Sequence, residues 1–227
     1  MVHVTSPATR VELPSALTEG RGVVLLPDAD QSALMPVMEV LVQEGIGTLA
    51  LPSPSAEQST AATKKALDAA GLAALSGMYS FRASIGMHGV HTLDDAHAAI
   101  AGGATLAFCR FPERGVIEEL QAGGVPAIVS ALTPTEVNQA WLSNVAAVHV
   151  EPSEVFGTGY AQSLSELVPE ALLIAMAQTP AAAQAWLRAG AVAVSMSRAL
   201  LSRVFLSQDY SALRQRVAEM VSAIGSS

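Results

Sequence analysis

Short runs of consecutive apolar residues recur along the chain, separated by longer segments with helical spacing. The runs are apolar throughout instead of alternating with polar residues, as expected of parallel strands that are buried on both faces. The eight runs cover residues 23–26, 48–51, 83–85, 104–108, 127–129, 145–150, 172–176 and 191–194.

Glycines and capping residues mark the ends of the predicted helices between these runs. A glycine just past a helix takes up the left-handed conformation that ends it. Helix starts are recognised by a Thr cap followed by Pro or by an acidic residue that completes a capping box. The predicted stops include Gly45, Gly71, Gly103, Gly124 and Gly190, and the predicted starts are Thr92 with Asp95, Thr133-Pro134 with Glu136, and Thr179-Pro180. Further helices are expected over 55–70 and 207–224, with an extra N-terminal arm or helix in 1–20.

Strands and helices that alternate this regularly predict an α/β fold, a (β/α)8 TIM barrel in a single domain over residues 1–227. The competing architecture is a doubly wound open sheet. Such a sheet usually has a glycine-rich phosphate loop after its first strand. Here that turn, residues 27–30, reads Pro-Asp-Ala-Asp and contains no glycine, which favours the closed barrel.

The composition of the chain narrows the kinds of molecule that it is expected to bind. Hydrophobic residues make up 51% of the chain, aromatic residues 4%, and the net charge is −8. With no run of Lys or Arg, nucleic-acid binding is not expected. The pattern also contains neither a membrane span nor a signal peptide, so a cytoplasmic protein is expected. The single cysteine, Cys109, excludes an intrachain disulfide and is expected to be a small buried core residue.

Candidate functional side chains follow the predicted strands, where barrels of this kind place their sites. Arg110 follows the fourth strand and suits a carboxylate ligand, or an ion pair with Glu113 or Glu151. Strand parity places His149 and Glu151 on the inner side, with the flanking valines under the helices. An inward cluster of His149, Glu151 and Arg110 is predicted, with a histidine that titrates near neutral pH. The alternative is a register shifted by one, which would place His149 under the helices.

Two further groups are weaker candidates. Ser195, Ser197 and Arg198 lie where the eighth strand meets a helix, a place that favours anions, although Ser197 could simply cap the helix and Arg198 be solvated. His88 and His91 are three residues apart and could share a metal ion, or be ordinary turn histidines, since no named zinc spacing is present.

The order of units over residues 20–205 resembles the 2-keto-3-deoxy-6-phosphogluconate and 4-hydroxy-2-oxoglutarate aldolase family. The resemblance is carried by the first strand in 22–27, the helix in 33–47, the turn in 86–92 and the strand Val-His-Val-Glu-Pro-Ser-Glu in 148–154. It implies a class I aldolase-like barrel, a lyase that cleaves carbon–carbon bonds, and a homotrimer. Apolar residues that could cover such an interface are Trp141, Phe205, Leu206 and Tyr210, although they could equally pack peripheral helices.

The catalytic and phosphate-binding residues of that family are not found at the matching positions of this sequence. Its Schiff-base lysine falls at His149, and the only lysines, Lys64 and Lys65, are neighbours in the expected 55–70 helix. Its acid/base glutamate falls at Ala50, the following basic residue at Pro54 and the third-strand threonine at Gly89. The phosphate turns read Ile-Ala-Met-Ala in 174–177 and Ser-Met-Ser in 195–197.

Loss of nucleophile, acid/base and phosphate loop together indicates a barrel without class I aldolase activity. It would bind a small carboxylate or phosphorylated ligand through Arg110, His149, Ser195, Ser197 and Arg198, or serve as an assembly component, and need no cofactor. The alternative is a divergent lyase acting on a 2-keto acid, in which His149 and Glu151, or a divalent metal, replace the imine.

Overall fold

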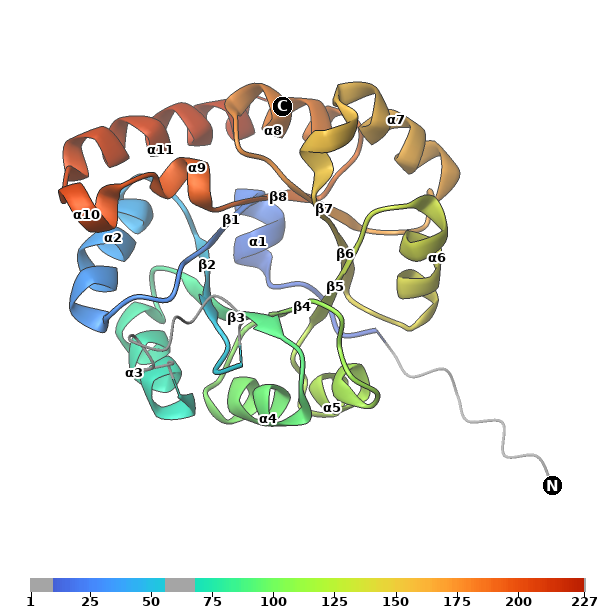
Figure 1. Ribbon diagram of the computed structural model, residues 1–227, viewed down its shortest axis with the longest axis horizontal. Coiled ribbons are helices and arrows are strands. Elements are labelled where there is room, and N and C mark those ends of the chain that lie inside the picture. Colours follow the sequence, from blue (N-terminus) through green and yellow to red (C-terminus); the bar gives the residue numbers. More distant parts are fainter. Residues whose placement is uncertain (1–9, 56–67, 227) are drawn as a thin grey trace.

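The computed structural model describes residues 10–55 and 68–226. Eight parallel strands form a closed barrel in the order β1 to β8, and the helices between them surround it (Figure 1). The strands are β1 (Gly22–Leu25), β2 (Thr48–Pro52), β3 (Ser84–Val90), β4 (Ala107–Cys109), β5 (Ala127–Ala131), β6 (Ala147–Val150), β7 (Leu173–Met176) and β8 (Ala193–Met196). Each apolar run in the sequence therefore contributes to one strand, and the open-sheet alternative is wrong.

Long helices follow the strands in turn, and short ones interrupt some of the connections. The helices are α1 (Ser15–Gly20), α2 (Gln31–Gln43), α3 (Ala69–Tyr79), α4 (Leu93–Ala101), α5 (Val116–Ala122), α6 (Pro134–Leu142), the 3-10 turn η1 (Ser153–Phe156), α7 (Thr158–Leu167), α8 (Pro180–Arg188), α9 (Arg198–Leu201), α10 (Val204–Ser207) and α11 (Tyr210–Gly225). Thr92, Thr133 and Thr179 cap α4, α6 and α8 as predicted, the first two in complete capping boxes.

The helix predicted over 55–70 is misplaced where the structure describes it. Ser55 lies in a turn, and α3 begins only at Ala69. Gly71, predicted as a helix stop, lies in the first turn of α3, because the side chain of Asp68 accepts a hydrogen bond from its backbone N–H and caps the start of the helix. The part of the prediction in 56–67, including Lys64 and Lys65, lies outside the described residues.

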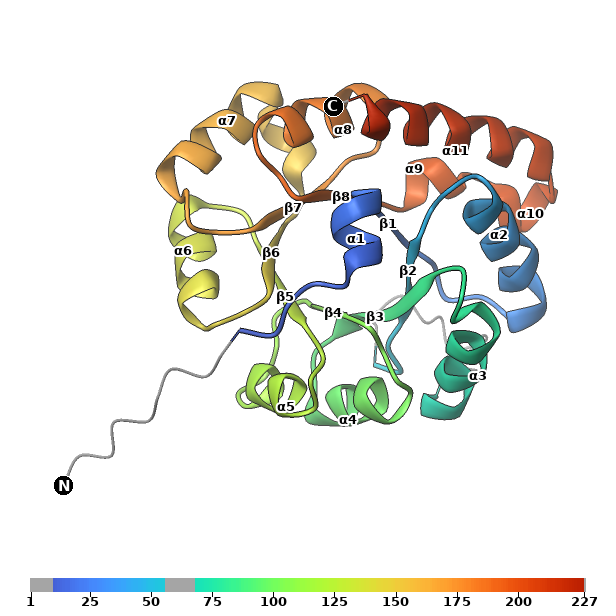
Figure 2. The same ribbon diagram turned by 180° about the vertical axis from the view of Figure 1, so that it is seen from behind.

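The two ends of the chain also differ in detail from the prediction. The terminal helix α11 begins at Tyr210 after its cap Asp209, while Ser207 ends the separate helix α10. In the N-terminal segment only α1 is helical among residues 10–20, and it lies across one end of the barrel (Figure 2). Leu17 of α1 is fully buried in the cluster that fills the barrel interior, so α1 closes that end.

Trp141, one of the apolar residues considered for an interface, is covered by the N-terminal arm. The guanidinium of Arg10 stacks 3.3 Å from the centre of the Trp141 ring and donates a hydrogen bond to the Val145 carbonyl at 2.8 Å. Phe205 and Tyr210 pack partly buried against the core, whereas Leu206 remains 89% exposed. Among the described residues, no helix is long and apolar enough to cross a membrane.

Candidate functional site

Side chains that point into the barrel form a core of their own, separate from the core under the helices. Val148 and Val150 pack in the outer core with helix residues, and His149, between them, packs its ring edge-on against the inward Phe108 with centroids 5.0 Å apart. The strand parity predicted from the sequence is therefore confirmed, and the shifted register is wrong. His149 lies inside the barrel and is 1% exposed.

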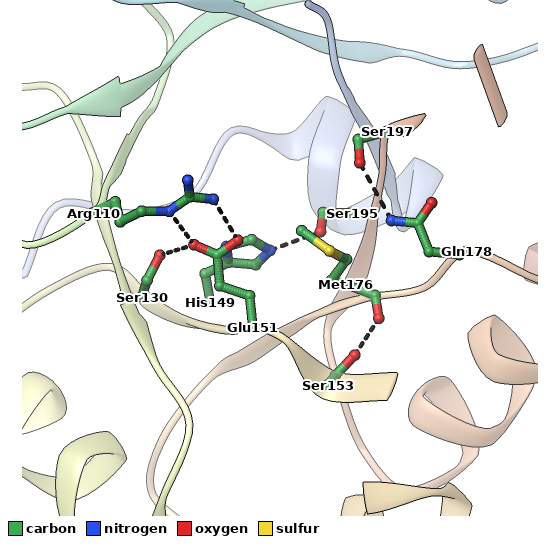
Figure 3. Close-up of polar contacts among 9 residues, drawn as sticks. All are labelled: Arg110, Ser130, His149, Glu151, Ser153, Met176, Gln178, Ser195 and Ser197. Carbon is green, nitrogen blue, oxygen red and sulfur yellow. Dashed lines mark hydrogen bonds and ion pairs between the residues drawn. The ribbon is translucent and has the colours of Figure 1, made fainter. Parts of the chain in front are cut away.

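A polar cluster closes the carboxyl-terminal end of the barrel, which we call the mouth (Figure 3). We define the polar cluster as Arg110, Ser130, His149, Glu151 and Ser195, which come from β4, β5, β6 and β8 or the residue after them. Arg110 donates from Nε and from a terminal nitrogen to the two carboxylate oxygens of Glu151, each at 2.9 Å. Ser130 Oγ donates to the same carboxylate at 2.6 Å. Of the two ion-pair partners predicted for Arg110, the structure selects Glu151.

His149 joins this carboxylate to a serine deeper in the barrel. Its Nδ1 lies 3.7 Å from Glu151 Oε2, and its Nε2 lies 2.7 Å from Ser195 Oγ. The proton of a neutral imidazole is best placed on Nδ1, which faces the carboxylate, so the Ser195 hydroxyl donates to Nε2. His149 and Ser195 are both buried, which leaves this hydrogen bond without solvent.

Burial sets the charge states of the cluster. Desolvation, opposed by Glu151 and reinforced by Arg110 and His88, lowers the pKa of His149 from 6.5 to about 4. The prediction that this histidine titrates near neutral pH is wrong, because the sequence does not reveal how completely the ring is buried. Burial alone would raise the pKa of Glu151, but the hydrogen bond from Arg110 and the neighbouring groups outweigh it and lower the pKa to about 2. At neutral pH the cluster thus holds one ion pair and a neutral imidazole.

The hydrogen bond between His149 and Ser195 gives a direct stability prediction. Ser195→Ala leaves the buried Nε2 without a partner, so we expect it to lower the free energy of unfolding by about 1–3 kcal/mol. Adding His149→Leu removes the unpaired nitrogen. The free energy of unfolding of the double variant should then lie within about 1 kcal/mol of the wild-type value, because both partners are apolar. Urea unfolding of the two single variants and the double variant measures this, and purely additive losses would contradict it.

The two candidate metal ligands, His88 and His91, form hydrogen bonds with different parts of the chain. Nε2 of His88 donates to the Leu26 carbonyl at 2.7 Å, and burial lowers the pKa of this ring. His91 lies in the exposed turn after β3, where its Nδ1 bonds the Phe111 carbonyl. Within residues 10–55 and 68–226, no group of three or more His, Cys, Asp or Glu side chains is placed to hold a metal ion.

Ser197 and Arg198 lie apart from Ser195. Ser195 turns inward to His149, whereas Ser197 accepts a hydrogen bond from the Gln178 side chain at 3.3 Å (Figure 3). The Gln178 carbonyl oxygen accepts from the backbone N–H of Ala199 at 3.0 Å, so it already satisfies a free N–H at the start of α9. Arg198 is exposed. The structure thus brings four of the named candidates, Arg110, His149, Glu151 and Ser195, into one cluster, and leaves Ser197 and Arg198 outside it.

Ser130 and Gln178 were not predicted from the sequence as site residues. Ser130 follows the inward Ile128 by two residues on β5, so the same parity argument that located His149 would have placed it inside. Gln178 follows β7 by two residues, in the connection to α8, and no pattern in the sequence signals its contacts.

The structure also describes Ala50 and Gly89, two positions at which the resemblance predicts polar groups of the aldolase family. Ala50 packs in the inner core of β2, so only a methyl group stands at that inward position. Gly89 has a φ of +76° at a bulge between β3 and β4, a conformation that a threonine would adopt only with strain. Surface hollows of about 120 and 540 Å³ lie beside α10 and between α7 and α8, and no residue of the polar cluster lines either of them.

Comparison with known proteins shows the class of fold. No family model and no curated protein sequence matches the chain. Many solved structures do match. One described as native KDPGal superposes with a TM-score of 0.74 and 20% identity, over 90% of this chain and 94% of that one. A KDPG aldolase from Legionella pneumophila, with pyruvate captured as a covalent carbinolamine, gives a TM-score of 0.71 and 14% identity, over 95% and 98%.

The likeness extends beyond aldolases. The α subunit of tryptophan synthase from Legionella pneumophila matches with a TM-score of 0.70 and 14% identity, over 93% of this chain and 96% of that one. At these identities the comparisons establish the fold, a TIM barrel similar to KDPG aldolase, and the activity has to be argued from the site.

Proposed function

We propose that this chain is a barrel that binds a small carboxylic acid at its mouth and has no class I aldolase activity. The observation that carries the proposal is the way Arg110, Ser130 and His149 surround one carboxylate, that of Glu151. Bidentate pairing with arginine plus a hydroxyl donor is how proteins recognise carboxylates specifically. A carboxylate is favoured over a phosphorylated ligand, because Ser195 and Ser197 are already bonded to His149 and Gln178.

The lack of a lysine at the position where the resemblance expects one supports the part of the proposal that excludes class I aldolase activity. The carbinolamine in the Legionella aldolase requires an amine that adds to the pyruvate ketone. Here the resemblance places His149 at the lysine position, and an imidazole forms no iminium. The inward position of β2 holds Ala50, which has no acid/base group.

Reduction with borohydride in the presence of pyruvate tests this directly. We expect the intact mass of the protein to remain unchanged, while a class I aldolase treated in parallel gains one reduced pyruvate per chain. The two lysines of the sequence, Lys64 and Lys65, are the sites to inspect by peptide mapping. A stable adduct on either of them would overturn the proposal.

Binding is tested by titrating pyruvate into the wild type and into Arg110→Gln. Because the guanidinium supplies the charge and the paired donors, its loss should weaken binding by about tenfold or more. Arg114→Gln is the matched control, since Arg114 is an exposed arginine in the same connection between β4 and α5. Equal affinities for all three proteins, or no binding to any, would contradict the assignment of the site.

The alternative is a lyase that uses His149 as a base on a 2-keto acid. The neutral imidazole beside Glu151 favours it, since a neutral ring accepts a proton at physiological pH. Aldol cleavage assays with and without Mn²⁺ separate the two functions. Turnover that is lost in His149→Leu would support the lyase. The homotrimer implied by the resemblance stays a prediction, which light scattering in solution would test.

A further inference from the structure

The side chain of Glu151 occupies a site that has the form of a ligand-binding site. Side chains from three strands converge on its carboxylate: the Arg110 guanidinium from the end of β4 and the Ser130 hydroxyl from β5 donate hydrogen bonds to it, and Nδ1 of His149 from β6 faces it at 3.7 Å. We name these three residues the carboxylate cradle. Together they engage both oxygens, which is the recognition pattern used for an external carboxylate.

The cradle is reached from the mouth through its arginine. The Arg110 side chain is 48% exposed, whereas the Glu151 side chain is 10% exposed and that of His149 1%. Arg110 and Glu151 each follow the last residue of a strand, at Cys109 and Val150. A dissolved carboxylate that arrives at the mouth therefore meets the exposed guanidinium before it meets the buried imidazole of His149.

We propose that the carboxylate cradle is a binding site for a small aliphatic monocarboxylate, which takes the position of the Glu151 side chain, and that Glu151 is an internal competitor filling the site without ligand. The inference rests on the proposed function and adds the binding mode. Exchange of one carboxylate for another keeps the ion pair and the hydroxyl hydrogen bond, so the cradle loses no partner. Glu151 competes at the high effective concentration of a tethered group, which weakens the wild-type affinity.

Replacing Glu151 with alanine tests this arrangement. Glu151→Ala deletes a CH2–COO⁻ unit and leaves the β-carbon, so acetate has the size and charge of the missing part. We expect the variant to melt at a lower temperature than the wild type. Acetate should then raise the melting temperature saturably at constant ionic strength, where chloride does not. The acetate affinity of the variant should exceed that of the wild type by about tenfold or more.

Two control variants complete the test. Glu154→Ala removes an exposed glutamate from η1, three residues further on, and should leave the response to acetate as in the wild type. Arg110→Gln combined with Glu151→Ala should abolish the rescue, because the charged donor is gone. If Glu151→Ala fails to fold, Glu151→Gln carries the test. It keeps the shape but removes the competing charge, and acetate should still bind more tightly than to the wild type.

The outcomes separate this inference from the proposed function. If the wild type binds pyruvate through Arg110 but neither Glu151 variant gains affinity for acetate, the internal-competitor inference is wrong and the proposed function stands. If Glu151→Ala takes up acetate saturably while the wild type binds no carboxylate, Glu151 is a permanent structural partner of the cradle, and both the inference and the proposed function fall. Absence of a saturable response in folded Glu151→Ala and Glu151→Gln overturns the inference.

Discussion

Acidification from about pH 6.5 to about pH 4 is expected to destabilise the protein by about 3 kcal/mol through His149 alone. The folded pKa of His149 lies below its unfolded value, so the unfolded chain binds a proton that the folded chain excludes. Stability is therefore full above the unfolded pKa of 6.5, and it declines as the pH falls toward the folded pKa of about 4. Urea unfolding at a series of pH values measures this slope.

Two neighbours of His149 also change how the free energy of unfolding depends on pH. His88 is partly buried, and desolvation lowers its pKa as well, so it adds to the slope in the same direction. Glu151 contributes below this window, because its depressed pKa means that its stabilising effect is lost only as the pH falls from 4.5 to about 2. His149→Leu should lose its own part of the slope and keep the parts that come from His88 and, near pH 4, from carboxylates with lowered pKa values. An unchanged slope in that variant would show that His149 is not the group responsible.

Gly86→Ala is expected to destabilise the barrel by about 2–3 kcal/mol. A β-carbon at position 86, on β3, would lie 2.6 Å from the carbonyl oxygen of Leu106 and 2.6 Å from its Cδ1. The side chain of Leu106 could move, but its carbonyl oxygen belongs to the neighbouring chain segment and cannot give way without shifting β4. Because His88 follows on β3 and Arg110 follows β4, we also expect weaker carboxylate binding in this variant.

Gly77→Ala is the matched control for that substitution. Gly77 lies on the exposed side of α3, and a β-carbon there would have no neighbour within 4 Å. Alanine should stabilise the helix by about 0.5–1 kcal/mol, since it restricts the unfolded chain and favours the helical backbone. Thermal or urea unfolding of both variants measures the contrast. Equal losses at positions 86 and 77 would show that close packing against Leu106 does not cause the effect.

The sequence predicts the structure correctly where an interaction joins residues that are close together in the chain. The threonine caps of α4, α6 and α8 depend on residues within one helical turn, and the structure has all three. The predicted helix over 55–70 was wrong where the structure describes it for a related reason. Asp68 caps a helix that begins at Ala69, so Gly71, which the sequence predicts as a helix end, lies in the first turn of that helix.

The sequence by itself determined the closed barrel, through its eight apolar runs, and the side of β6 on which His149 and Glu151 lie. Both follow from periodicity, which adjacent residues encode. Only the tertiary structure decided that Arg110 pairs with Glu151, that Ser130 completes the carboxylate cradle, and that Ser195 bonds to His149 across 46 residues of chain. It also decided the low pKa of His149, because desolvation depends on every strand around the ring and not on its neighbours in the sequence.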